Sequence, residues 1–392
     1  MKLKVKNNKK KLKAPKLRFP EFTDDWEKCS LNKFTEYESS NYSISQFNEC
    51  NLSGKYKVFD VNKEIACIDE FDQLNEYISI IKDGAGIGRT EIRPEKSSVI
   101  GTMGYIKSIN SDIYFVYSLI KNVKWNKYKN GSTIPHVYYK DYGNEKFFIP
   151  NKDEQAKIGK FFKEIDRFIT LNQNKISHIK DLKAGLLQKM FPKNGETKPE
   201  IRFDGFTDDW EECKLGDVVD IFDGTHQTPE YTNSGVKFVS VENIRNLETK
   251  KYISQKAYQK EYSNKQAEKG DVLMTRIGDI GTAKIIESTE PLAYYVTLAL
   301  LKPKKVDSHF LAWLIGSSEI QKNIWKRTLH IAFPKKINLG EINKIELTIP
   351  NISEQKKIGK FFSQLDNLLT LYQCKLEHLQ EQKKSLLKQM FI

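Results

Sequence analysis

The stretch IPNISEQKKIGKFFSQLDNLLTL, residues 349–371, has a near-copy earlier in the chain, IPNKDEQAKIGKFFKEIDRFITL, residues 149–171. Both copies begin with Ile-Pro-Asn and share Glu-Gln and Ile-Gly-Lys-Phe-Phe. In each, an Asn stands three residues before a Glu, which is the spacing of a helix capping box. Apolar residues then recur every three or four positions as far as residues 190 and 390. This pattern predicts two long amphipathic helices with a coiled-coil or bundle seam, each about 57 Å long.

A second stretch is also repeated. PKLRFPEFTDDWEKCSL (15–31) returns as PEIRFDGFTDDWEECKL (199–215). The chain therefore contains two copies of one unit, made of a short lead segment, a globular part and a long helix. The globular parts, residues 32–148 and 216–348, have diverged and mix short β-type runs with turns, which predicts α+β domains.

We therefore expect an α+β fold in which two globular domains are separated by two long antiparallel helices, with a pseudo-two-fold internal repeat. The expected segments are a basic N-terminal arm (1–14), a first globular domain (15–150), a central helix (151–190), a linker (191–200), a second globular domain (201–350) and a C-terminal helix (351–392).

Composition narrows the class of partner. The 392 residues carry 64 Lys+Arg against 51 Asp+Glu, a net charge of +13, and such an excess favours a polyanion such as nucleic acid. The five cysteines and six histidines show no metal-ligand spacing, so we expect no disulfide scaffold and no metal site. No apolar run is long enough to cross a bilayer. The basic N-terminus lacks the apolar region of a secretory signal, so we expect no membrane partner and a cytoplasmic location.

Two kinds of loop are candidates for nucleic-acid contact. SIIKDGAGIG (79–88) and LMTRIGDIG (273–281) share a strand, a polar turn and Ile-Gly, and neither fits a nucleotide-binding motif. A tight turn with positive φ is the simpler explanation, and a turn that faces a nucleic-acid backbone is the functional one. NGSTIPHVYYK (130–140) and DGTHQTPEY (223–231) present hydroxyl, amide and imidazole groups, which can read base edges.

No catalytic site is predicted. Pro229-Glu230 with Glu248-x-Lys250 matches a metal-dependent nuclease pattern, as does Pro199-Glu200 with Glu212-x-Lys214. Such matches arise by chance in a chain with 29% charged residues. The first copy of the lead segment also lacks the second pattern.

With RFxxFTDDWE twice, the long helix twice, and DGTHQTP and MTRIGDIG in the second variable part, the chain resembles the specificity subunit of type I restriction-modification enzymes. The resemblance implies a non-catalytic subunit with two target-recognition domains, each of which reads one half of a bipartite, asymmetric DNA site. It implies that the helices dock methyltransferase subunits, that a restriction/translocase subunit joins them, and that S-adenosylmethionine, ATP and Mg are bound by those partners and not by this chain.

Residues in the loops are the expected contacts with double-stranded DNA: Lys82, Arg89, Thr133, His136 and Tyr138 in the first domain, and Thr225, His226, Gln227, Thr228, Arg276, Lys335 and Lys336 in the second. Phe161, Phe162, Phe361 and Phe362 are candidates for the subunit interface, although packing between helices explains them equally well. Two other hypotheses remain open at this point. One is a restriction endonuclease or single-chain restriction-modification enzyme, and the other is a coiled-coil adaptor without a DNA role.

Overall fold

The computed structural model describes residues 4–5, 14–47, 54–193 and 195–392. Most of the predicted basic arm therefore lies outside the described residues. Cys50 also lies outside them, as does Asn194, which belongs to the predicted linker. The chain forms two compact units. Unit 1 comprises Met1–Gln173 and Cys374–Ile392, and unit 2 comprises Asn174–Gln373. Each unit thus combines a globular part with portions of both long helices.

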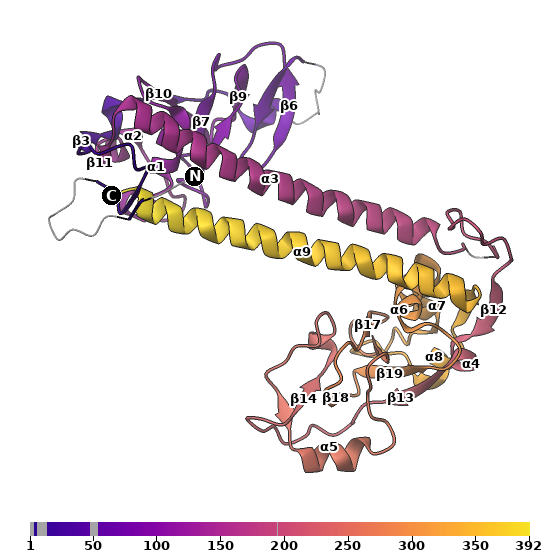
Figure 1. The fold of residues 1–392 in the computed structure, drawn as a ribbon. Coiled ribbons are helices and arrows are strands. Elements are labelled where there is room, and N and C mark those ends of the chain that lie inside the picture. Colours follow the sequence, from indigo (N-terminus) through magenta and orange to yellow (C-terminus); the bar gives the residue numbers. More distant parts are fainter. Residues whose placement is uncertain (1–3, 6–13, 48–53, 194) are drawn as a thin grey trace. The chain divides into compact units, whose positions relative to one another are not determined.

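The two repeated stretches begin the long helices α3 (Lys152–Lys189) and α9 (Ile352–Met390) (Figure 1). In unit 1, the first part of α3 runs antiparallel to the last part of α9, with Asp166 paired to Lys383 and Phe162 packed 5.9 Å from Phe391. These contacts confirm the predicted α+β fold with antiparallel helices.

Unit 2 contains the corresponding contacts with the helices exchanged. Asp366 of α9 pairs with Lys183 of α3, and Phe362 stacks 6.1 Å from Phe191. The end of each helix therefore lies in the core of the unit that contains the start of the other helix.

Each long helix begins with half of the predicted capping box. The Oδ1 atoms of Asn151 and Asn351 accept hydrogen bonds from the amides of Glu154 and Glu354, at 3.0 and 3.1 Å. The other half of the prediction is wrong, because neither Glu returns to the cap. The Glu154 carboxylate instead accepts two 2.7 Å hydrogen bonds from Arg18 in the lead segment.

Glu354 makes the same bidentate pair with Arg202, again at 2.7 Å. A guanidinium fork matches a carboxylate geometrically, and a fully buried carboxylate such as that of Glu154 or Glu354 requires such pairing. The two stretches that repeat in the sequence are therefore the two sides of one contact, which accounts for their joint similarity.

Aromatic residues complete this junction between lead segment and helix. Phe19 meets Phe161 edge-on at 6.0 Å, and Phe203 meets Phe361 at 5.7 Å. Trp26 is buried in unit 1, where it packs against the ring of Phe391 at 6.3 Å.

The repeated glycine of Ile-Gly-Lys-Phe-Phe has a steric cause. A Cβ at Gly159 would collide with the Asp112 carboxylate, and a Cβ at Gly359 would lie 2.8 Å from Asp307 Oδ1. These two aspartates are the N-caps of shorter helices. The glycines therefore permit the N-terminus of a second helix to approach each long helix closely.

Unit 1 contains a four-stranded sheet of order β4-β10-β7-β8, a three-stranded sheet of order β6-β5-β9 and the pair β11-β3. The short helix α1 packs on the four-stranded sheet. The elements are β1 (Lys4–Val5), β2 (Leu17–Arg18), β3 (Glu27–Ser30), β4 (Thr35–Ser39), β5 (Tyr56–Phe59), β6 (Glu64–Ile68), β7 (Tyr77–Ile81), β8 (Thr90–Arg93), β9 (Ser97–Val99), β10 (Met103–Ser108), α1 (Ile113–Ile120), α2 (Tyr139–Tyr142) and β11 (Lys146–Ile149).

Unit 2 repeats this plan, with sheets of order β13-β19-β16-β17 and β15-β14-β18 and the pair β12-β20. In each three-stranded sheet the central strand pairs parallel with one neighbour and antiparallel with the other. The elements are β12 (Glu211–Lys214), α4 (Leu215–Val218), β13 (Val219–Asp223), β14 (Val236–Val239), β15 (Tyr252–Ile253), α5 (Gln255–Tyr262), β16 (Val272–Thr275), β17 (Ala283–Ile285), β18 (Leu292–Tyr294), β19 (Leu298–Pro303), α6 (Ser308–Ile315), α7 (Ser318–Arg327), α8 (Leu339–Asn343) and β20 (Glu346–Ile349).

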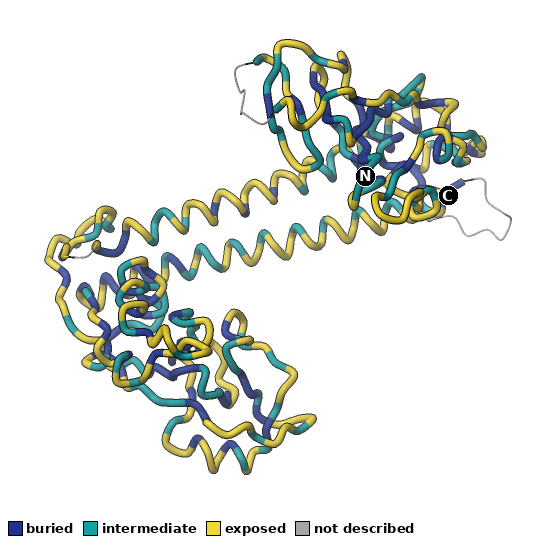
Figure 2. Tube along the Cα trace, turned by 180° about the vertical axis from the view of Figure 1, so that it is seen from behind, coloured by how far each residue is buried: buried dark blue, intermediate teal, exposed yellow. Residues whose placement is uncertain are grey.

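The diverged parts therefore share one topology that their sequences barely reveal. Figure 2 shows that buried residues gather in the globular parts, whereas the middles of the long helices are mostly exposed. Among the described residues, no helix is both long and apolar enough to cross a membrane.

Candidate nucleic-acid interface

In both units, a glycine-containing turn follows a central strand of the larger sheet, with three glycines in unit 1 and two in unit 2. We call it the glycine turn, residues 82–88 in unit 1 and 276–281 in unit 2. Gly84 and Gly278 have φ values of 96° and 86°, a region that residues with a Cβ rarely adopt. The turns close through hydrogen bonds from Gly88 N to Ile81 O and from Gly281 N to Thr275 O, both 2.9 Å. The predicted tight turn with positive φ is confirmed.

A second loop packs against each glycine turn. We call it the tip loop, residues 130–136 in unit 1 and 329–336 in unit 2. In unit 1, Gly84 N donates to Pro135 O and Val137 N donates to Lys82 O, both at 2.9 Å. Segments about 50 residues apart in the sequence therefore form one surface.

Unit 2 has the same two hydrogen bonds, from Gly278 N to Lys335 O and from Ile337 N to Arg276 O, both 2.9 Å. The bridge between Ile277 and Lys336 corresponds to the bridge between Asp83 and His136. The two units thus present different side chains on one backbone arrangement.

In unit 1, this arrangement leaves several polar side chains near the surface. His136 Nδ1 lies 2.6 Å from Asp83 Oδ1, which orients the imidazole, and the ring of Tyr138 stacks on it at 6.3 Å. Thr133 and Tyr138 are exposed, and Lys82 Nζ lies 3.4 Å from Ser39 Oγ.

The tyrosine that follows Tyr138 points inward. Tyr139 donates a 2.7 Å hydrogen bond to the carbonyl of Thr35. Burial raises the pKa of Tyr139, and a second hydrogen bond, with the side-chain hydroxyl of Thr35 at 2.8 Å, offsets part of this rise. The hydroxyl therefore remains a neutral donor that anchors the segment after the tip loop.

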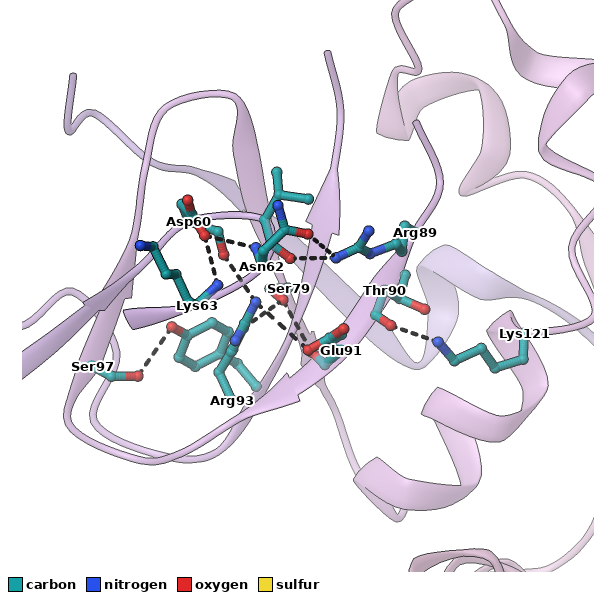
Figure 3. A network of polar contacts seen from close by, with 12 residues as sticks. Asp60, Asn62, Lys63, Ser79, Arg89, Thr90, Glu91, Arg93, Ser97 and Lys121 are labelled. Carbon is teal, nitrogen blue, oxygen red and sulfur yellow. Dashed lines mark hydrogen bonds and ion pairs between the residues drawn. The ribbon is translucent and has the colours of Figure 1, made fainter. Parts of the chain in front are cut away.

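Arg89, directly after the glycine turn, is exposed and donates 2.7 Å hydrogen bonds to Val61 O and Asn62 Oδ1 (Figure 3). The buried Arg93 lies beside it and donates to Ser79 Oγ at 3.1 Å and to Asp60 O at 3.0 Å. The two arginines thus attach the turn at residues 60–63 to the sheet. Arg89 still has donors that face solvent, because a guanidinium carries five N–H groups.

Arg276, in contrast, is not a surface residue. Its guanidinium is buried and donates to Asp223 Oδ1 at 2.6 Å, Ile337 O at 3.2 Å and Val296 O at 3.3 Å. A buried charge is stable only when it is paired and hydrogen-bonded. The predicted contact between the Arg276 side chain and DNA therefore needs correction, because the side chain joins the glycine turn to the end of β13, to Val296 and to Ile337, directly after the tip loop.

The loop after β13 is partly internal as well. Thr225 is buried and its backbone pairs with Tyr294 and Val296, so its hydroxyl is not presented outward. His226, Gln227 and Thr228 are exposed. His226 Nε2 lies 2.7 Å from Asp223 Oδ2, so the carboxylate that pairs with Arg276 also orients this imidazole.

Two lysines complete the surface of unit 2. Lys335 and Lys336 are exposed, and Lys335 Nζ lies over the ring of Trp325 at 4.6 Å. The aspartates that orient the histidines were missed in the sequence. A signal was available only for Asp223, which stands three residues before His226.

Of the four helix phenylalanines proposed for a subunit interface, two are fully buried and two are partly exposed. Phe162 and Phe362 are fully buried, in the cores of unit 1 and unit 2. Phe161 and Phe361 are partly buried against the lead segments. These residues stabilise the junctions, which was the alternative explanation. Large exposed apolar residues on the helices lie further along, at Phe168, Leu171, Leu182, Leu368 and Leu371.

The structure offers no metal-binding group of three or more His, Cys, Asp or Glu side chains within its described ranges. The residues of the nuclease-like patterns have other partners: Glu248 pairs with Lys237 at 3.1 Å, and Glu200 pairs with Lys189 at 2.7 Å. The pKa of Glu200 is lowered mainly by its hydrogen bond to Lys189.

The two domains share one topology but present different loop surfaces, and each is followed by a near-identical long helix. This arrangement defines a binding protein with two separate recognition surfaces. Residues 23–181 and 207–381 match the family model of the type I restriction modification DNA specificity domain. The chain therefore belongs to the family of type I restriction-modification specificity subunits, the non-catalytic component that recognises the DNA target.

Similar proteins agree with this assignment. The chain is 26% identical over 405 residues to the type I restriction enzyme MjaVIII specificity subunit of Methanocaldococcus jannaschii, covering 95% of this chain and 92% of that one. It is 27% identical over 197 residues to the putative type I restriction enzyme MjaX specificity subunit of the same organism, covering 47% of this chain and 46% of that one.

Solved structures share the fold. The type I restriction-modification S subunit from M. genitalium superposes with a TM-score of 0.70 at 18% identity, covering 97% of this chain and 99% of that one. A chain from a study of complex assembly and conformational transition of the type I R-M system gives 0.51 at 16% identity, covering 92% and 96%. The family match confirms the predicted specificity subunit and does not support an endonuclease or single-chain enzyme.

Proposed function

We propose that the glycine turn and tip loop of each unit contact one half of a bipartite, asymmetric site on double-stranded DNA. The observation that carries the proposal is the set of corresponding backbone bonds between glycine turn and tip loop, which hold different side chains in the two units: the position of His136 in unit 1 is that of Lys336 in unit 2. Such an arrangement allows two different sequences to be read with one mode of docking.

The exposed and partly exposed side chains suit two kinds of contact. Arg89, Lys335 and Lys336 can neutralise phosphates, which positions the protein and makes affinity fall with salt. His136, His226 and Gln227 can form hydrogen bonds with base edges, and each carboxylate partner holds an imidazole in a defined orientation.

We also propose that methyltransferase subunits dock on the exposed apolar residues of the long helices. Phe168 and Leu171 of α3 correspond to Leu368 and Leu371 of α9, 200 positions later, and exposed apolar side chains of this size mark interaction surfaces when they cluster. A restriction/translocase subunit would join this complex in the cytoplasm. S-adenosylmethionine, ATP and Mg would then be bound by the partners.

The first test is a mobility shift with the chain and its methyltransferase subunits. The duplex probe carries the site obtained by mapping methylated adenines in the source genome. We expect sequence-preferring binding that weakens steeply as salt rises. Binding without sequence preference, or cleavage of DNA by the purified chain with Mg²⁺, would contradict the proposal.

A domain exchange tests the division into half-sites. Replacing residues 216–348 with those of a relative should change one half of the methylated sequence and leave the other half and the complex intact. A change in both halves would show that the units do not read independently.

Docking is tested by Leu371→Asp, which places a charge on the proposed contact and should reduce co-purification with methyltransferase subunits. Leu74→Asp is the matched control, since Leu74 is an exposed leucine of similar accessibility outside the helices. Equal co-purification of both variants would show that methyltransferase subunits do not dock on this face of the helix.

A further inference from the structure

The tip loop of unit 2 exposes two large apolar side chains that packing does not explain. Ile331 and Phe333 are 99% and 103% exposed. Isolated apolar residues on a surface are common, but these two stand together on a loop held at both ends. Leu329 N donates to Lys336 O at 2.8 Å, and Gly278 N donates to Lys335 O at 2.9 Å. The side chains therefore project from an anchored base.

Unit 1 also presents an exposed apolar residue near the end of its tip loop. Ile134 is 58% exposed and precedes Pro135, as Phe333 precedes Pro334. Ile134 and Phe333 each stand four residues after the first residue of the bridge that closes the loop, Asn130–His136 in unit 1 and Leu329–Lys336 in unit 2. The loop of unit 2 is one residue longer, so the bond from Gly278 N goes to Lys335 O, one residue beyond Pro334, whereas the bond from Gly84 N goes to Pro135 O. An exposed apolar residue followed by proline thus occurs twice, in domains whose sequences otherwise diverged.

The neighbours of the tip in unit 2 are cationic. Lys335 and Lys336 are exposed directly after Pro334, and the Lys335 ammonium lies over the Trp325 ring at 4.6 Å. The ring of Trp325 in turn lies 4.1 Å from that of His330. An apolar tip with two lysines beside it matches a ligand that has an apolar surface bordered by anions, and the bases of DNA between their phosphates have this chemistry.

We propose that Phe333 and Ile134 contact the bases, one in each half-site, with their side chains against the apolar surface of a base while neighbouring cations hold phosphates. Ile331 enlarges the tip in unit 2. The inference rests on the proposed function, since it requires that the tip loops face DNA. Apolar side chains contact thymine methyl groups in the major groove, and others insert between base steps.

Because such contacts carry no charge, they contribute discrimination between sequences without adding to the salt dependence. The lysines act in the opposite way, since phosphate contacts contribute affinity on any sequence. The two kinds of residue are therefore separable by experiment although they are adjacent in the chain.

The experiment uses the complex of the full chain with its methyltransferase subunits, a duplex with the mapped site and a scrambled duplex of equal composition. Phe333→Ala should weaken binding to the mapped duplex by about tenfold, leave the scrambled duplex nearly unchanged and leave the salt dependence unaltered. Ile134→Ala should behave in the same way. Changing bases in one half-site should abolish the effect of one variant only.

Lys335→Ala combined with Lys336→Ala is the matched comparison. This variant should weaken binding to both duplexes and lower the slope of log affinity against log salt by about two, one for each phosphate contact. Lys256→Ala with Lys260→Ala, two exposed lysines on α5, controls for the loss of charge alone.

Two further arms identify the kind of base contact. If the tip packs on a thymine methyl group, replacing thymine by uracil in the half-site should remove the difference between wild type and Phe333→Ala. If it inserts between base steps, 2-aminopurine placed there should become more fluorescent in the wild-type complex than in the variant.

Several outcomes would overturn the inference. A wild-type preference for the mapped duplex that Phe333→Ala retains in full would overturn it and leave the proposed function standing. Impaired assembly of Phe333→Ala with methyltransferase subunits in the absence of DNA would make the tip a protein contact. A wild-type complex without preference for the mapped duplex would overturn the proposed function, and the inference with it. The melting temperature of the variant should match wild type, because the side chain is fully exposed.

Discussion

The junctions between lead segment and long helix use the same residues in both units but not the same hydrogen bonds. In unit 1, Trp26 Nε1 donates to the Glu154 carboxylate at 3.2 Å, in addition to the pair that this carboxylate makes with Arg18. In unit 2, the equivalent Trp210 Nε1 has no hydrogen-bond partner among the described residues.

For the adjacent glutamine, it is the copy in unit 2 that has the additional hydrogen bond. Gln355 Oε1 accepts a 2.9 Å hydrogen bond from Asp307 N, whereas Gln155 Oε1 is buried and has no partner within the described ranges. Sequence identity at a junction therefore does not imply identical energetics, and paired substitutions can measure the difference.

The largest effect is expected from Glu154→Gln. It leaves the buried Arg18 without its counter-charge, and breaking such a pair costs about 3–5 kcal/mol. Glu354→Gln should cost less, because Arg202 is more exposed and no tryptophan donates to that carboxylate. Hydrogen exchange in each unit, measured at increasing urea concentration, gives the loss of stability for each variant. Equal losses would show that the extra hydrogen bond of unit 1 has no energetic weight.

Phe191→Ala and Phe391→Ala test the exchange of helix ends between the units. Each phenylalanine is buried in an aromatic cluster, and removal of such a side chain costs about 3–5 kcal/mol. Phe191→Ala should increase hydrogen exchange in unit 2, and Phe391→Ala should increase it in unit 1. If either variant loosened the other unit instead, the assignment of the helix ends would be wrong.

Gly159→Ala and Gly359→Ala probe the close approach of the second helix. Overpacking costs about 1–3 kcal/mol, and Gly159→Ala should lie at the higher end because its Cβ would collide with the Asp112 carboxylate. Differential scanning calorimetry of the two variants gives the comparison. Gly185→Ala is the control, since nothing lies within 4 Å of a Cβ at that helical position.

The smallest effect is expected from the tryptophans. Trp26→Phe removes a hydrogen bond to a carboxylate and should cost about 1–2 kcal/mol more than Trp210→Phe, which removes none among the described residues. The difference in denaturant midpoint between the two variants is the observable. Indistinguishable midpoints would mean that the 3.2 Å contact contributes nothing.

Much of the architecture could be predicted because local rules govern it. The spacing of apolar residues and the asparagine caps indicated both long helices, and the turns at Gly84 and Gly278 were expected from their glycines. The double repeat also indicated the family. In contrast, almost nothing in the sequence indicated that the diverged parts share one strand order, because many different apolar sequences satisfy the same pattern of burial.

The candidate interface was predicted at the level of loops and not of side chains. Arg276 and Thr225 lie in the candidate segments but are buried, while the exposed Phe333 was not singled out. Composition suggests which residue types can contact DNA. Whether a given side chain faces solvent depends on partners such as Asp223, 53 positions from Arg276.

The sequence by itself determined that the chain is a duplicated unit with a constant helix and a variable domain, because helix periodicity and repetition are properties of neighbouring residues. Only the tertiary structure decided that Glu154 binds Arg18, that Phe162 is core and that the tip loops rest on the glycine turns. Each of these contacts joins segments distant in the chain, and burial and pairing across such distances are properties of the folded chain as a whole.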